Sequence, residues 1–329
     1  MSIQLNREPA ASQSATQAHW LTVIIPSFRG ERWIATALDS LAAEAAAGIE
    51  VLVIDSSPTA ETREIARSYS NRLQLRVFER ADLKSWHTKT NFGVEAANSA
   101  HICWLGVDDI WLSGRSQAVR GWIDAGPNVP LHLASGAIIG KTGKRLAIWR
   151  CPLRTRTELS SESVIERLLV QNFIAAPAPV FRRDAWLACG GLDTDLWYTA
   201  DWDMWLKLAA RGPVLYHDEP TIGFRVHGDS LTISGSRDIA DFESQMRTVL
   251  ERHLEAYAGN RIEVERAARA SIAVNCALAL ASQGDRSRLV AAAHTVLRLG
   301  PRGAHRYLRD SRIMERIFSR VRAKFTGAF

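Results

Sequence analysis

Residues 21–55 read LTVIIPSFRGERWIATALDSLAAEAAAGIEVLVID, and this stretch decides the fold class. It begins and ends with short apolar runs, 21–26 and 50–55, which have the pattern of buried strands. The segment between them has apolar residues at helical spacing, namely Trp33, Ile34, Ala37, Leu38 and Leu41. Gly48 suits the end of that helix. The stretch therefore predicts a strand–helix–strand unit.

The same unit recurs further along the chain. The pattern predicts strands at 50–55, 73–79 and 101–107, and helices within 56–69 and near 91–100. Pro58 suits the start of the first of these helices, and Ser57 or Thr59 would cap it. Strands that alternate with helices imply right-handed crossovers and a mainly parallel sheet. We therefore predict an α/β fold whose ligands bind beyond the carboxyl ends of the strands.

The amino-acid composition is typical of a globular protein. The chain has 329 residues, of which 47% are apolar, enough for a large core. Its four cysteines show no CxxC spacing, which fits a reducing compartment. No apolar run reaches the roughly 18 residues that a membrane span needs. Residues 1–19 lack the apolar core of a signal peptide, so we expect a disordered leader and a cytoplasmic protein.

The later part of the chain changes character. Short strands are predicted within 131–150 and a helix at 161–170, and the chain reads as wholly helical from 238. We therefore expect a catalytic domain over residues 20–237 and a helical C-terminal region over 238–329.

Positive charge is concentrated near the C-terminus. The net charge is +6, and residues 261–324 hold fourteen Arg and Lys against five Asp and Glu. Residues 305–325 predict a basic amphipathic helix with an apolar stripe, which consists of Tyr307, Leu308, Ile313, Met314, Ile317, Phe318, Val321 and Phe325. Such a helix either lies at the inner face of the cytoplasmic membrane or packs on the catalytic domain or a second subunit. Nucleic acid is not an expected partner, because no aromatic platform of a known RNA-binding module is present.

Two adjacent carboxylates end the strand predicted at 101–107. In HICWLGVDDIW (101–111), Asp108 and Asp109 follow a mostly apolar run, and each raises the cost of ionising the other. A divalent cation between them would remove this cost, whereas a solvated turn would merely tolerate it. No GxGxxG follows the first strand and no GxxxxGK[ST] is present, which excludes glycine-rich phosphate binding. A phosphate bound without such a loop is usually bound through a cation.

Seven short motifs, taken in order over positions 20–235, resemble glycosyltransferase family 2. They are VIIPSF, VLVIDSS, NFGVEAA, WLGVDDIW, FRRDAWLACGGLD, ADWDMWLKLA and FRVHGDSLT. This resemblance implies the GT-A fold and an inverting, metal-dependent transfer from a nucleotide sugar. It also implies a UDP-sugar donor first, with GDP- and dTDP-sugars as alternatives, and a surface or envelope glycan or a lipid-linked molecule as acceptor.

The resemblance also implies the site residues. Those expected at the nucleotide sugar are Pro26, Ser27, Asp55, Lys89, Asn91 and Asp108. Asp108 and Asp109 would bind Mg²⁺ or Mn²⁺, with His227 as a third ligand on the metal side. Asp201 would be the catalytic base that accepts the proton of the acceptor hydroxyl, and Asp203 is the rival candidate.

The chemistry requires these residue types. A hard cation on carboxylates stabilises the departing diphosphate, and one carboxylate suffices as base when no covalent intermediate forms. Trp202, Trp205 and Leu206 are expected to face the core beneath that carboxylate. Asp201 and Asp203 also suit the first turn of a helix for purely structural reasons.

Structural roles are also open for the other predicted site residues. Asp55 would cap a helix, Asn91 would be a turn or cap residue, and His227 a loop histidine.

The chain departs from the family pattern at three positions. Ser56, Gly106 and Ala200 stand where acids are common in the family. The retained acids Asp108, Asp109 and Asp201 favour an enzyme. The alternative is a catalytically silent relative that binds a nucleotide sugar or a glycan as an assembly partner.

Overall fold

The computed structural model describes residues 19–44, 47–155, 157–228 and 238–315. Its strands are β1 Leu21–Ser27, β2 Ile49–Asp55, β3 Gln74–Glu79, β4 His101–Trp104, β5 Ile110–Trp111, β6 Leu131–Ile139, β7 Arg145–Trp149, β8 Glu158–Leu159, β9 Val180–Arg182 and β10 Val214–Arg225. Its helices are α1 Ile34–Ala42, α2 Glu61–Arg67, α3 Trp86–Ala96, α4 Arg115–Ala125, α5 Ser161–Val170, α6 Arg183–Ala188, α7 Ala200–Ala209, α9 Ile239–Leu254, α10 Arg261–Ser282, α11 Leu289–Leu297 and α12 Gly300–Ser311.

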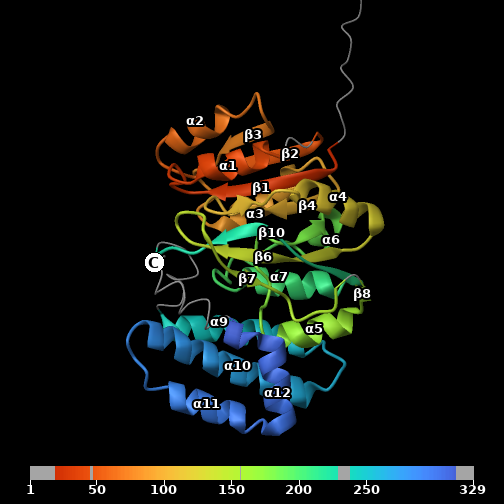
Figure 1. Cartoon of the computed structure of the whole chain (residues 1–329), viewed down its shortest axis with the longest axis vertical. Helices are drawn as coiled ribbons and strands as arrows, with labels where there is room; N and C mark the ends of the chain where they lie inside the picture. The colour runs from red at the N-terminus through yellow and green to blue at the C-terminus, as the bar shows by residue number, and fades with distance from the viewer. Residues whose placement is uncertain (1–18, 45–46, 156, 229–237, 316–329) are drawn as a thin grey trace, which may run out of the picture.

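All the strands belong to one sheet, with helices on both faces (Figure 1). The order is β3-β2-β1-β4-β9-β6-β10-β5, with β7 added on β6 and β8 on β10. Parallel pairing joins β3, β2, β1 and β4, and also β6 with β10, so it includes most of the paired residues. The predicted α/β fold with a mainly parallel sheet is confirmed.

Strand β1 separates two hydrophobic clusters. Alternate residues of a strand point to opposite faces, so Val23 and Ile25 join the cluster that includes α1, whereas Ile24 joins the cluster on the other face. The second cluster is the larger and reaches α7 and the C-terminal helices. Its centre is aromatic: the rings of Trp104 and Trp205 stack with centroids 4.9 Å apart.

In the C-terminal region, α9, α10 and α12 pack on α5, α9 also contacts α7, and these three helices share that second cluster. In Figure 1 they lie at the end of the molecule opposite α2 and β3. The predicted uninterrupted helix over 305–325 is wrong at Arg312, whose φ of +48° ends α12. Tyr307 and Ile313 are buried, whereas Leu308 and Met314 are 44% and 49% exposed. The rest of the predicted stripe lies outside the described residues.

Two predicted helix starts need correction. Helix α2 begins at Glu61 without a side-chain cap, because the Ser57 hydroxyl donates a hydrogen bond to Asp55 and Thr59 makes no cap. Helix α3 begins at Trp86, well before residue 91, because Ser85 accepts a hydrogen bond from Thr88 N and caps it. Within the described residues, no helix is both long and apolar enough to cross a bilayer.

The aromatic centre yields a stability prediction. We expect Trp205→Ala to lower the free energy of unfolding by about 3–5 kcal/mol, because Trp205 is fully buried and its loss leaves a cavity. Leu297→Ala is the control, since Leu297 is 72% exposed. Urea denaturation measures both variants. A loss below about 1 kcal/mol for Trp205→Ala would contradict this packing.

Candidate active site

The carboxyl ends of β1 and β2 meet at one edge of the sheet, because Ser27 pairs in register with Asp55. Asp55 is fully buried, and its two carboxylate oxygens are occupied. Arg63 Nη1 donates to Oδ2 at 2.8 Å, and the Ser57 hydroxyl donates to Oδ1 at 2.6 Å. Asp55 therefore does not cap α2, and it fixes the loop after β2 through Arg63 and Ser57.

Lys89 lies beneath the loop that follows β1. Its side chain is buried, and Nζ donates to the Ser27 carbonyl and to the Ser56 hydroxyl, both at 2.8 Å. Burial lowers the pKa of Lys89 to about 8, although Asp55 acts in the opposite direction. The serine that replaces a family acid at position 56 thus binds this ammonium.

The loop after β1 presents a residue that the sequence reasoning missed. Phe28 is 54% exposed, and Lys89 Nζ lies 5.7 Å from its ring centroid. Arg29 has a φ of +50° and donates its N–H to the Ser57 hydroxyl. The signal in the sequence was an aromatic residue in the SFRG turn directly after the first buried strand.

A second group of polar residues lies where the chain leaves β4. Asp108 Oδ2 is 2.8 Å from His227 Nε2, and the Asp108 side chain is 25% exposed. Trp33 stacks on His227 with ring centroids 5.3 Å apart. Arg225 also contacts Trp33, since its guanidinium lies over the indole ring, 4.7 Å from the centroid. The structure thus brings Asp108 and His227 together, and their role as metal ligands stays a prediction.

Asp109 has a different environment from Asp108. It is buried, and its Oδ1 accepts a hydrogen bond from Arg225 N at 2.8 Å. Burial, followed by the charge of Asp108, raises the pKa of Asp109 well above its usual range. A Cβ at Gly106 would lie 2.5 Å from Asp109 Oδ2, so this packing requires glycine at a position where the family often has an acid.

The donor atoms at Asp108 and His227 fit a divalent cation that also binds substrate. Among the described residues, no three His, Cys, Asp or Glu side chains are placed to hold one metal ion. The predicted three-ligand set is therefore not formed, because Asp109 is directed to Arg225 instead. One carboxylate and one imidazole, completed by diphosphate oxygens, remain a suitable set for Mn²⁺.

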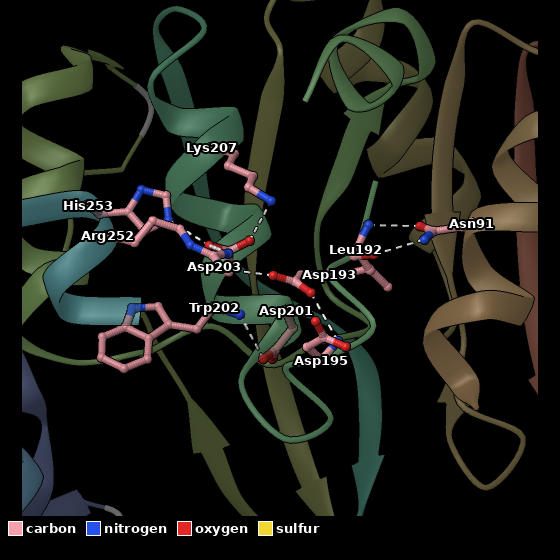
Figure 2. Close-up of polar contacts among 10 residues, drawn as sticks. All are labelled: Asn91, Leu192, Asp193, Asp195, Asp201, Trp202, Asp203, Lys207, Arg252 and His253. Carbon is pink, nitrogen blue, oxygen red and sulfur yellow. Dashed lines mark hydrogen bonds and ion pairs between the residues drawn. The ribbon is translucent and has the colours of Figure 1, made fainter. Parts of the chain in front are cut away.

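The two acids at the start of α7 are also in different environments (Figure 2). Asp201 is partly buried; Oδ1 accepts from Trp202 N at 2.7 Å, and Oδ2 accepts from Asn172 Nδ2 at 3.3 Å. Burial raises the pKa of Asp201 to about 6. Among the described residues, no cationic side chain forms an ion pair with Asp201.

Asp203, in contrast, is fully buried and bound by cationic side chains. Arg252 Nη1 donates to Oδ1 at 2.9 Å, His253 Nε2 lies 2.8 Å from the same oxygen, and Lys207 Nζ lies 2.6 Å from Oδ2. Burial raises the pKa of Asp203, but the contacts with His253 and Lys207 outweigh this and lower the pKa to about 2. An acid bound in this way is a poor proton acceptor.

Asn91 contacts the backbone. Its Nδ2 donates to the Leu192 carbonyl at 2.9 Å, and its Oδ1 accepts from Leu192 N at 2.8 Å. The adjacent Gly191 has a φ of +77°, and a Cβ there would lie 2.8 Å from Asn91 Oδ1. Figure 2 shows the two contacts between Asn91 and Leu192. Asn91 therefore fixes the glycine turn that leads towards α7.

Residues 22–181 match the family described as Glycosyl transferase family 2. The chain is a family 2 glycosyltransferase. An uncharacterised glycosyltransferase of Rickettsia typhi is 22% identical over 70% of this chain and 71% of its own length. A glycosyltransferase of PGL/p-HBAD biosynthesis from Mycobacterium tuberculosis is 25% identical over 56% of this chain and 68% of its own.

Solved structures show the same fold as this glycosyltransferase. Residues 1–349 of Staphylococcus aureus TarS, in complex with UDP-GlcNAc, match with a TM-score of 0.63 and 15% identity, over 94% of this chain and 92% of that one. In a longer TarS structure the chain covers 42% of the neighbour. A Pyrobaculum calidifontis mannosyltransferase with GDP-Man and Mn²⁺ matches with a TM-score of 0.50 and 16% identity, over 93% of this chain and 87% of that one.

The cations around Asp203 predict a pH-dependent contribution to the stability of the glycosyltransferase. We expect Asp203→Asn to lower the free energy of unfolding by about 2–3 kcal/mol at neutral pH, because the buried carboxylate is replaced by a neutral amide that cannot pair with its partly exposed basic partners. The folded pKa of about 2 lies below the ordinary value. This stabilisation should therefore be complete above about pH 4 and be lost as the pH falls towards 2.

Urea denaturation between pH 2 and 8 measures this difference. The expected result is that the two proteins differ at neutral pH and converge in acid. Equal stability at pH 7 would show that the ion pairs of Asp203 contribute nothing.

Proposed function

We propose that this glycosyltransferase moves a sugar, with inversion at the anomeric carbon, from a nucleoside-diphosphate sugar to a hydroxyl of a surface or envelope glycan. The observation that carries the proposal is the separation of roles in the Asp201–Asp203 pair. Asp201 has a raised pKa and is partly exposed, whereas Asp203 is bound by cations. Such a site offers one carboxylate base, and a direct displacement needs only one.

The donor would lie over the joined ends of β1, β2 and β4. Phe28 is exposed there and offers a face on which a nucleobase can stack. Lys89 places a positive charge beneath the same loop and fixes Ser27 and Ser56. Pro26 and Asp55 shape this edge from the strands. The similar structures of TarS with UDP-GlcNAc and of the Pyrobaculum calidifontis mannosyltransferase with GDP-Man support a nucleotide sugar as the donor.

Asp108 and His227 would hold the divalent cation. When bound, Mg²⁺ or Mn²⁺ supplies positive charge that stabilises the leaving diphosphate. Trp33 and Arg225 hold the imidazole and the Asp108 backbone in place, since Arg225 Nε donates to the Asp108 carbonyl at 2.6 Å. The Mn²⁺ in the similar Pyrobaculum calidifontis mannosyltransferase structure supports this assignment.

Asp201 would accept the proton of the acceptor hydroxyl. Its pKa of about 6 keeps it ionised at neutral pH and makes it a stronger base than an ordinary aspartate. Asn172 donates to one oxygen and Trp202 N to the other, so the carboxylate is oriented before the acceptor binds. The side chains of Trp202 and Trp205 are buried in the core, as expected from the sequence.

The acceptor and the membrane contact belong to the same proposal. Leu308 and Met314 are exposed and line a surface pocket together with Arg154, Arg309 and Arg312. Apolar and basic side chains in one place suit an anionic lipid surface. A glycosyltransferase with a lipid-linked acceptor would gain from being held there.

Replacing the base tests the proposed reaction. We expect Asp201→Asn to lower kcat by roughly 10²–10⁴-fold, because an amide cannot accept the proton. Nucleotide affinity should stay unchanged, since the proposal places Asp201 against the acceptor hydroxyl and not against the nucleotide. In the unaltered protein, kcat/KM should fall as the pH drops below about 6, where Asp201 becomes protonated.

A panel of UDP-, GDP- and dTDP-sugars, assayed by release of nucleoside diphosphate, provides the activity measurement. Asp124→Asn is the control, because Asp124 is an exposed acid on α4 that pairs with Arg120. Full activity of Asp201→Asn would show that another group is the base. The absence of turnover with every donor, combined with nucleotide binding, would favour the silent relative.

Removing the metal ligand tests the other half of the site. We expect Asp108→Ala to abolish the Mn²⁺-dependent part of UDP binding in isothermal titration, and His227→Ala to weaken it by roughly 10–100-fold. EDTA should have the same effect on the unaltered protein. Binding and turnover that persist after thorough chelation would rule out the metal assignment.

A further inference from the structure

Helix α9 contacts the loop that leads to Asp201 at two points. The Trp197 indole Nε1 donates to Asp241 Oδ2 at 2.6 Å, and Tyr198 N donates to Gln245 Oε1 at 2.9 Å. Gln245 Nε2 in turn donates to Asp241. The loop just before α7 is thus bound to a helix of the C-terminal region.

A third contact joins the two ends of this loop. Arg252 Nη2 donates to Asp193 Oδ2, and Nη1 donates to Asp203 Oδ1, both at 2.9 Å. One guanidinium therefore bridges the residue that follows Leu192 and an acid in the first turn of α7 (Figure 2). On the side of α3, Asn91 holds Leu192 itself.

These contacts come from one face of α9. Asp241, Gln245 and Arg252 are four and seven residues apart, a spacing that places side chains on the same side of a helix. We name these three residues the α9 clamp. They lie far beyond residues 22–181, which match the family.

Helix α7 needs such contacts at its start. Its N-cap, Thr199, makes no capping hydrogen bond through its side chain. A helix whose first turn lacks a cap depends on other groups to fix that turn. Asp201 lies in this turn, and among the described residues its carboxylate accepts hydrogen bonds from Trp202 N and from Asn172 Nδ2.

We infer that the α9 clamp is a positioning element for the catalytic base, and that Arg252 is its central residue. This inference rests on the proposed role of Asp201 as base. Arg252 donates hydrogen bonds to Asp193 and Asp203, and not to the base itself. It would therefore affect catalysis indirectly, by fixing the segment that carries Asp201. A base must be held within a fraction of an ångström to accept its proton efficiently.

Two variants separate positioning from charge balance. Arg252→Lys keeps a positive charge near Asp203, but one ammonium cannot bridge two carboxylates as a guanidinium fork does. Asp193→Asn removes the other end of the bridge and leaves Arg252, His253 and Lys207 on Asp203. Arg247→Gln is the matched control, because it breaks an exposed pair with Glu243 on the same helix.

The readouts are steady-state kinetics with the nucleotide sugar that the unaltered protein turns over, and hydrogen exchange of residues 193–203. We expect Arg252→Lys and Asp193→Asn each to lower kcat about tenfold or more, with KM for the donor unchanged. Exchange of the loop should rise in both variants and stay unchanged in Arg247→Gln. Melting temperatures should match that of the control.

Failure of this inference is distinguishable from failure of the proposed function. If the unaltered protein turns over no nucleotide sugar, the proposed function fails, and unchanged loop exchange in both variants would overturn the clamp as well. If the protein is active and both variants keep its kcat, Arg252 does not position the base, whatever the loop exchange shows. A lower melting temperature with unchanged kcat would make the clamp merely structural.

Discussion

Parallel pairing of β1 with both β2 and β4 is the constraint on which the site depends. Because Ser27 is in register with Asp55, and Leu105 N donates to the Ile24 carbonyl, three chain segments leave the sheet at the same edge. A Cβ at Gly30 would meet Ser27 and Val107 at 2.6 Å, so the loops after β1 and β4 are in direct contact. The exposed Phe28 and the Asp108–His227 contact follow from this arrangement.

The site contains two pairs of aspartates that are close in the sequence, Asp108 with Asp109 and Asp201 with Asp203. In each pair the two side chains have different surroundings. Asp109 is buried and accepts a hydrogen bond from Arg225, whereas Asp108 reaches solvent beside His227. Asp203 is bound by cations, whereas Asp201 has a raised pKa. In each pair one carboxylate supports the fold and the other is available for chemistry. All four residues are aspartates, so the differences between them come from their surroundings and not from the residue type.

The strand and helix pattern could be predicted from the sequence because apolar periodicity reports burial directly. Grouping Asp108 with His227 required the resemblance to the family, since the two residues are far apart in the chain. The partners of Asp55, Asn91 and Asp203 could not be predicted, because Arg63, Leu192 and Arg252 reach them only through tertiary packing. The end of α12 at Arg312 could not be predicted either, because the spacing of apolar residues does not indicate where the backbone adopts a left-handed conformation.

A crystal structure of the protein with UDP and Mn²⁺, with data collected at the manganese absorption edge, tests the account most directly. It locates the cation, the diphosphate and the residues around them in one measurement. We expect an anomalous peak about 2.0–2.3 Å from an Asp108 carboxylate oxygen and from His227 Nε2, with the diphosphate on its other side. A bound nucleotide with no peak there, and with the Asp108–His227 hydrogen bond intact, would contradict the account.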